Sequence, residues 1–189
     1  ETEKWYYKAT KKIMANENFD LSLDIYRKTF LENNKGAWHL LDNNDNNYII
    51  NLRNKRNELY SEYLSIKNIF TIDLNDLLSS LSNKYTMGIV TSSKKHHFDI
   101  IHQRGNILHY FEFIVASGDY SNSKPDPEPY LIGIQKSGYK ASECIAIEDS
   151  ERGIIAAKKA NLYCIAVPNE MTKNSDFSKA DIVATNIQQ

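Results

Sequence analysis

The chain has 189 residues, with 23 Lys and Arg against 24 Asp and Glu, and a formal net charge of −1. Its hydrophobic fraction of 41% is enough to build a core, which excludes wholesale disorder. A net charge so close to zero argues against a general nucleic-acid binder. No apolar run approaches the ~20 residues of a membrane span, and residues 1–20 contain no signal-peptide pattern. We expect a soluble cytoplasmic protein with no nucleic-acid or membrane partner.

The two cysteines, Cys144 and Cys164, each lie in a short run of apolar and β-branched residues. Free cysteine behaves in such a run as a small buried hydrophobe. We expect neither a structural disulfide nor a metal knuckle.

The chain changes character near residue 85. All four prolines and six of the seven glycines lie at or beyond residue 88, and only Gly36 precedes them. Before that point, apolar residues recur at helical spacing, which predicts a helical bundle over residues 4–80. The groups are Tyr6, Ala9 and Ile13; Leu23, Tyr26 and Phe30; Leu59, Tyr63 and Ile66; and Leu74, Leu77, Leu78 and Leu81. The Asn-rich stretches 16–18 and 42–47 favour loops between these helices.

Residues 81–189 alternate short apolar runs with longer amphipathic ones. The runs 87–90, 113–116, 144–147, 163–167 and 181–184 predict strands, and 94–103, 129–137 and 150–160 predict helices. We expect Ser150 to cap the last helix and Asn161 to follow it. The alternation predicts an α/β fold with a parallel sheet flanked by helices.

Polar side chains gather where three of the predicted strands end, namely Thr91 and Ser92, Lys124, and the pair Glu148 and Asp149. A hydroxyl beside backbone N–H groups can bind phosphate, and a lysine adds positive charge. Two carboxylates supply the oxygen ligands that Mg²⁺ prefers. Each group alone also has a structural interpretation: a helix cap, a solvated loop lysine or a surface acidic pair. Their order and spacing favour a phosphoryl-transfer site.

The order of these groups resembles the haloacid dehalogenase superfamily, in the branch that contains phosphoglycolate phosphatase and beta-phosphoglucomutase. The resemblance rests on Thr91 after its strand, on residues 123–127 (SKPDP) and on residues 144–157 (CIAIEDSERGIIAA). It implies a Rossmann-like core over 81–189 together with 1–3, and an inserted helical cap over 4–80. It also implies a Mg²⁺-dependent phosphatase that acts on a small phosphorylated metabolite, such as a sugar phosphate, through an aspartyl-phosphate.

The resemblance assigns roles to individual residues. Thr91 and Lys124 match catalytic positions, and Ser92 joins them in binding phosphate. Glu148 and Asp149 match the Mg²⁺ ligands. In the cap, four residues are expected to contact the substrate: Lys35, Gly36, Trp38 and His39. We expect the protein to be a monomer.

The family's first motif is not found in residues 1–189. That motif is a strand followed by D-x-D-G, in which the first aspartate is the nucleophile and the second the general acid/base. In this fold its strand lies between the strand ending at Thr91 and the strand before Asp149. A missing central strand would orphan buried backbone groups at ~1–3 kcal/mol each, against a total stability of ~5–15 kcal/mol. We therefore expect further residues before Glu1, roughly a strand of ~5–6 residues and an acidic loop.

Two other functions stay open. One is phosphoryl transfer of the beta-phosphoglucomutase type, but Tyr6 and His39 stand where the mutase carries a histidine and an arginine. A phenol with a pKa of ~10 is a poor proton shuttle near neutrality, so phosphatase activity is favoured. The other is a catalytically silent, phosphate-binding scaffold, which only the absent nucleophile supports.

Overall fold

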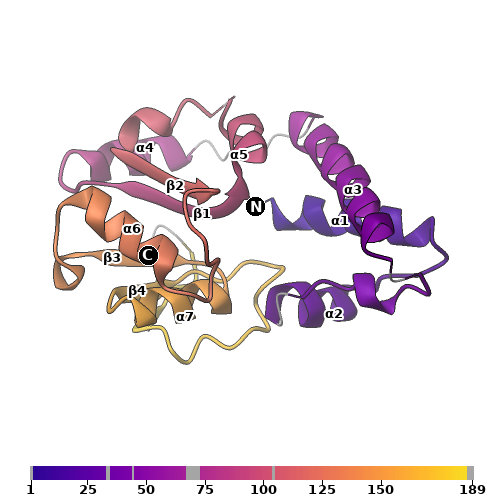
Figure 1. Cartoon of the computed structure of the whole chain (residues 1–189). Coiled ribbons are helices and arrows are strands. Elements are labelled where there is room, and N and C mark those ends of the chain that lie inside the picture. The colour runs from indigo at the N-terminus through magenta and orange to yellow at the C-terminus, as the bar shows by residue number, and fades with distance from the viewer. Residues whose placement is uncertain (1, 33–34, 44, 67–72, 104, 187–189) are drawn as a thin grey trace. The chain divides into compact units, whose positions relative to one another are not determined.

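Two compact units make up the chain, residues 1–69 and residues 70–189. The computed structural model describes residues 2–32, 35–43, 45–66, 73–103 and 105–186. The first unit is helical, and the second carries the strands together with further helices (Figure 1).

The first unit contains the helices that the apolar spacing predicts. They are α1 (Glu3–Ala15), α2 (Leu23–Tyr26), the π-helical turn η1 (Arg27–Glu32), the 3-10 turn η2 (Trp38–Leu40) and α3 (Asn46–Ile66). Helix α1 packs against α3. Polar side chains cap two helices: Ser22 accepts from the N–H of Ile25, and Asp45, in the predicted loop 42–47, accepts from the N–H of Tyr48. Residues 16–18 form a turn, as predicted, whereas α3 begins at Asn46, inside the predicted loop 42–47.

Aromatic rings fill the core of the first unit. The ring centroids of Tyr6 and Tyr60 lie 5.2 Å apart edge to face, and those of Tyr26 and Phe30 lie 4.6 Å apart in a stack. Both arrangements are favourable for aromatic pairs. These rings bring α1, α2, η1 and α3 together into one bundle.

The second unit has an α/β fold, as predicted. Its elements are α4 (Asp73–Ser82), β1 (Gly88–Lys94), α5 (Lys95–His102), η3 (Leu108–Tyr110), β2 (Phe113–Ser117), α6 (Glu128–Ser137), η4 (Ala141–Glu143), β3 (Ile145–Glu148), α7 (Glu151–Lys159), β4 (Tyr163–Ala166) and β5 (Ile182–Val183). β1 pairs with β2, β3 with β4 and β4 with β5, and all three pairings are parallel. Helices α5 and α6 pack on β1 and β2, and α7 packs on β3 and β4. The predicted parallel sheet flanked by helices is confirmed.

The strands form two separate ladders within the described ranges, β1–β2 and β3–β4–β5. In this part of the chain no strand pairs with both β1 and β3, so the expected strand of the first motif stays a prediction. In β3, Ala146 and Glu148 are buried, whereas Ile145 and Ile147 are exposed. Because side chains alternate along a strand, one face of this ladder packs on α7 and the other is open.

The end of β1 and the units of α4 and Glu3 differ from the sequence-based expectation. Strand β1 runs on to Lys94, and its register with β2 shifts between Val90 and Lys94. Lys94 precedes α5 without a side-chain cap, so Thr91 and Ser92 do not cap that helix. Helix α4, which we expected in the cap, belongs to the second unit, where Asn75 accepts a hydrogen bond from Tyr110. Glu3, which we expected in the Rossmann-like core domain, is the first residue of α1 and belongs to the first unit.

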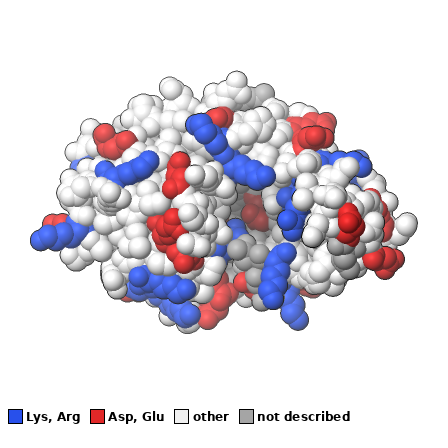
Figure 2. Space-filling view, in the orientation of Figure 1, with Lys and Arg blue, Asp and Glu red and all other residues white. Residues whose placement is uncertain are grey.

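The state of the cysteines, the charges on one face and the character of the helices are also seen in the structure. Cys144 and Cys164 are both free, and Cys164 is fully buried. Acidic and basic side chains are interspersed on the face drawn in Figure 2. Among the helices that the structure describes, none is both long enough and apolar enough to cross a membrane.

Gly36 closes the turn after η1 with a φ of +72°, and its N–H donates to the carbonyl of Thr29. A Cβ at this position would lie 3.1 Å from Cδ1 of Trp38 and 3.3 Å from Phe30. A left-handed φ alone costs an L residue roughly 1–2 kcal/mol. The turn therefore requires glycine both for its backbone and for its packing.

Substituting Gly36→Ala should lower the free energy of unfolding of the first unit by about 2 kcal/mol, because strain and crowding add. Both tryptophans, Trp5 and Trp38, lie in that unit, so urea unfolding followed by tryptophan fluorescence measures it. Gly138→Ala is the control for backbone strain alone, since its φ is +75° but no atom lies within 4 Å of the added Cβ; because Gly138 lies in the second unit, its unfolding is followed by far-UV circular dichroism. Equal shifts of the two variants would contradict the packing argument.

Candidate functional site

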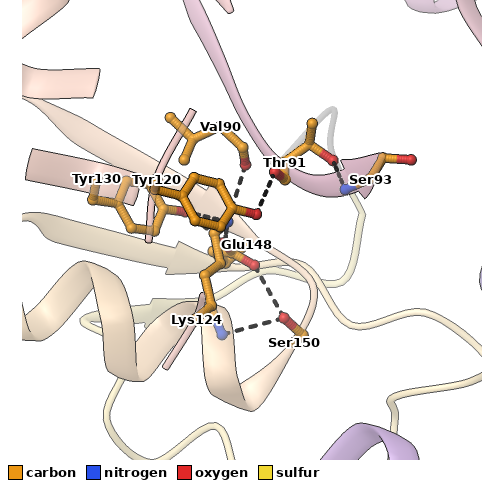
Figure 3. A network of polar contacts seen from close by, with 9 residues as sticks. Val90, Thr91, Ser93, Tyr120, Lys124, Tyr130, Glu148 and Ser150 are labelled. Atoms are coloured by element: carbon orange, nitrogen blue, oxygen red, sulfur yellow. Dashed lines mark hydrogen bonds and ion pairs between the residues drawn. The ribbon is translucent and has the colours of Figure 1, made fainter. Parts of the chain in front are cut away.

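Lys124 is the centre of a buried polar network that joins Val90 of β1 to the carboxyl end of β3 (Figure 3). Its side chain is only 6% exposed. Its Nζ donates to the carbonyl of Val90 at 3.0 Å and to Oε1 of Glu148 at 2.5 Å. It is therefore not the solvated loop lysine that its proline neighbour would suggest.

The loop that carries Lys124 is fixed at the start of α6. The carboxylate of Glu128 accepts the backbone N–H groups of Ser121 and Asn122, both at 2.7 Å. These hydrogen bonds lower the pKa of Glu128 below its usual value. Asp126 accepts the N–H of Glu128 at 2.9 Å and so caps the same helix. The lysine thus extends from a loop that is fixed on both sides of it.

Glu148 is the last residue of β3, and it is 7% exposed. Besides Lys124, its Oε1 accepts the hydroxyl of Tyr130 at 2.5 Å, and its Oε2 accepts the hydroxyl of Ser150 at 3.2 Å. A side chain at Gly153 would overlap this carboxylate, so glycine in the first turn of α7 makes room for it. Ser150 also caps α7, as predicted, by accepting the N–H of Gly153.

Tyr130, from α6, completes the contacts of the Lys124–Glu148 pair. Its hydroxyl lies 3.4 Å from Nζ of Lys124, and that ammonium lies 4.5 Å from the centre of its ring. Burial, and then the negative charge of Glu148, raise the pKa of Tyr130 well above 10. The hydroxyl therefore remains protonated and acts as the donor to Glu148.

Thr91 lies in β1, directly after the carbonyl that Lys124 binds. Its Oγ1 accepts the N–H of Ser93 at 3.1 Å, and its carbonyl accepts the hydroxyl of Tyr120 at 3.2 Å. A hydroxyl that accepts one hydrogen bond can still donate its own proton to a phosphate oxygen. Ser92, the other predicted phosphate-binding residue, is exposed and lies near the hydroxyl of Tyr120.

Asp149, next to Glu148, is exposed, and its Oδ2 accepts Nδ2 of Asn169 at 2.9 Å. The other end of the Asn169 amide accepts the N–H of Met171 at 2.8 Å, which fixes which atom faces Asp149. No cluster of three potential metal-binding side chains occurs in the part of the chain that the structure describes. Mg²⁺ needs only a few carboxylates, because water and substrate supply its other ligands. Asp149 suits that role, whereas both oxygens of Glu148 already accept hydrogen bonds.

The four residues expected to contact substrate in the cap all belong to the first unit. Lys35 and His39 are exposed, and Gly36 and Trp38 are buried. The guanidinium of Arg56 lies over the rings of Tyr6, at 4.2 Å, and Trp38, at 5.6 Å. Burial lowers the pKa of Arg56 below its usual value. The substrate contacts of these residues stay predictions.

Sequence reasoning missed three residues that the structure connects to the predicted ones: Tyr130, Asn169 and Arg56. Tyr130 lies six positions after Lys124, on an apolar helix face that predicts only a core residue. Asn169 follows β4, so its position just beyond a strand end was the available signal. Arg56 gave no signal, because charged residues on a long helix usually face solvent.

Comparison with known proteins identifies several relatives. A family model described as haloacid dehalogenase-like hydrolase matches residues 1–167. Protein CbbY of Rhodobacter capsulatus is 39% identical over 71 residues, which are 38% of this chain and 31% of that protein. Fructose-1-phosphate phosphatase YqaB of Escherichia coli is 27% identical over 96 residues, which are 51% of each chain. The crystal structure of beta-phosphoglucomutase from Clostridium difficile has a TM-score of 0.81 at 21% identity, covering 98% of this chain and 85% of that one. The matched region spans only 31% to 51% of the two curated relatives.

Breaking the buried ion pair should destabilise the second unit strongly. Glu148→Gln leaves the ammonium of Lys124 without a counter-charge, and such a loss costs about 3 kcal/mol. Urea unfolding followed by far-UV circular dichroism measures it. The control is Glu170→Gln, which removes an exposed ion pair with Lys173 and should cost less than about 1 kcal/mol. If the two variants lost equal stability, the buried pair would not have the importance that its geometry indicates.

Proposed function

This chain belongs to the haloacid dehalogenase-like hydrolase family, and on that premise we propose that it is a phosphatase that hydrolyses a small phosphorylated metabolite. The single observation that carries the proposal is the position of Lys124. A buried ammonium, held between Val90 of β1 and the end of β3, supplies fixed positive charge next to Thr91, which follows Val90 in β1. Ligands of parallel sheets bind at this edge.

Each residue of the site has a separate proposed role. Lys124 and the hydroxyl of Thr91 hold the oxygens of the phosphoryl group, and Ser92 adds a further donor. Glu148 serves as the counter-charge that fixes Lys124. Preorganised charge of this kind is worth most when negative charge builds up on the phosphoryl oxygens. The resemblance implies an aspartate nucleophile that would form an aspartyl-phosphate, and no residue of 1–189 is assigned that role.

We propose that the cofactor is Mg²⁺ and that Asp149 holds it, with Asn169 fixing the orientation of that carboxylate. When bound, the ion would neutralise charge on the phosphate oxygens. Glu148 was expected as a second ligand. We favour Asp149 alone for direct contact with the ion, because both carboxylate oxygens of Glu148 already accept hydrogen bonds, from Lys124, Tyr130 and Ser150.

The substrate is proposed to be a sugar phosphate or a compound of similar size. YqaB, which matches half of this chain, is a fructose-1-phosphate phosphatase. Phosphate release from a panel of phosphorylated metabolites, measured with full-length protein and Mg²⁺, tests this. Absence of release from every member of the panel would refute the proposed activity.

Asp149→Asn should lower Mg²⁺-dependent turnover roughly a hundredfold or more while preserving the fold, because it removes the charge of a ligand without changing its shape. Phosphate release and circular dichroism together measure this. Asp99→Asn, an exposed residue of α5, is the control and should leave turnover unchanged. Retention of most activity by Asp149→Asn would rule out the metal assignment.

Mutase activity is the alternative, and the likeness in fold to beta-phosphoglucomutase keeps it in view. Tyr6, however, packs its ring against Tyr60 and Arg56, and His39 is exposed. We expect no conversion of glucose 1-phosphate to glucose 6-phosphate, even when a sugar bisphosphate is added to prime the reaction. A coupled assay for glucose 6-phosphate measures this, and efficient conversion would favour the mutase over the phosphatase.

A further inference from the structure

Tyr130 makes more polar contacts with the site than core packing requires. It is 7% exposed, and its ring belongs to a core cluster with Ala146 and Ile154. A phenylalanine would fill the same volume. Yet the hydroxyl of Tyr130 reaches Oε1 of Glu148 at 2.5 Å, and Lys124 lies over its ring (Figure 3). The hydroxyl therefore contacts the one ion pair on which the proposed chemistry depends.

The hydrogen bonds of the pair show what the hydroxyl does. A lysine ammonium has three N–H groups. One points to the carbonyl of Val90 at 3.0 Å and a second to Oε1 of Glu148 at 2.5 Å. The hydroxyl oxygen of Tyr130 lies 3.4 Å from Nζ, longer than an ordinary hydrogen bond, so the third N–H can still reach a phosphate oxygen. Lys124 is thus confined by a carbonyl, a carboxylate and a phenol.

The phenol also acts on the carboxylate. Oε1 of Glu148 accepts hydrogen bonds from both Lys124 and Tyr130, whereas Oε2 accepts one from Ser150 (Figure 3). The two hydrogen bonds fix the position of Oε1 of Glu148. Because Oε1 also pairs with Lys124, its position in turn fixes the ammonium. A long lysine side chain otherwise has about 2 kcal/mol of rotamer freedom. The ring face below the ammonium adds a cation–π contact at 4.5 Å.

We propose that Tyr130 is a positioning residue: through Glu148, its hydroxyl holds the ammonium of Lys124 where it meets the phosphoryl oxygens. This inference rests on the proposed function, because it assumes that Lys124 binds phosphate. It goes beyond that function by assigning a role to an α6 residue for which the sequence pattern indicates no function. It also separates the two parts of the side chain, since the ring packs and the hydroxyl positions.

Tyr130→Phe tests the hydroxyl alone, because the ring and its cation–π contact remain. In full-length protein with Mg²⁺ we expect kcat for the best substrate of the panel to fall about tenfold, with a smaller change in KM. We also expect the affinity for inorganic phosphate, measured by isothermal titration calorimetry, to weaken about threefold or more. The control is Tyr139→Phe, which removes an exposed hydroxyl that lies 3.3 Å from Thr86 and should change neither value by more than about twofold.

A double-mutant cycle then tests whether the hydroxyl acts through Glu148. The effects of Tyr130→Phe and Glu148→Gln on phosphate affinity should be strongly non-additive, since both disturb one hydrogen-bonded unit. Additive effects would overturn the proposal. So would wild-type kcat and phosphate affinity in a Tyr130→Phe protein of lower thermal stability, because the hydroxyl would then be only structural. If the unaltered protein hydrolyses no phosphomonoester, the proposed function fails, but the calorimetric comparison still decides the role of Tyr130.

Discussion

The ion pair between Lys124 and Glu148 is the interaction on which the site depends. Two charges removed from water cost several kcal/mol each unless hydrogen bonds and mutual attraction offset that cost. This chain meets that requirement with Val90, Tyr130 and Ser150, which come from β1, α6 and the start of α7. The pair therefore joins Val90 of β1 to the end of β3, although these strands do not pair with each other in the described ranges.

Most of the architecture could be predicted because it follows from local pattern. Alternation along residues 145–148 places Glu148 on the same face as buried Ala146, and Ser150 caps α7 as its residue type and position indicate. The extent of β1 was harder. Thr91, Ser92 and Ser93 favour a cap by composition, yet the backbone stays extended to Lys94. Propensity is a weak guide where pairing with a neighbouring strand decides the conformation.

The contacts of the site could not be predicted, because they join residues far apart in sequence. Lys124 and Glu148 are 24 positions apart, and Asp149 and Asn169 are 20 apart. Spacing along the chain indicates which strand ends carry polar groups, but not which oxygen each donor reaches. That Glu148 is the counter-charge of Lys124 is therefore visible only in the fold. Arg56 shows the same limit, since only the packed bundle places it over Tyr6 and Trp38.

We propose that this edge of the sheet binds phosphate through Lys124 and a divalent ion through Asp149. A crystal structure of the full-length protein with Mn²⁺ and inorganic phosphate tests it most directly, because Mn²⁺ is located by its anomalous signal. We expect the ion beside Asp149, phosphate oxygens within hydrogen-bond distance of Nζ of Lys124 and Oγ1 of Thr91, and Lys124 still paired with Glu148. Binding of the ion to Glu148 with Lys124 displaced, or binding of ion and phosphate elsewhere, would contradict the account.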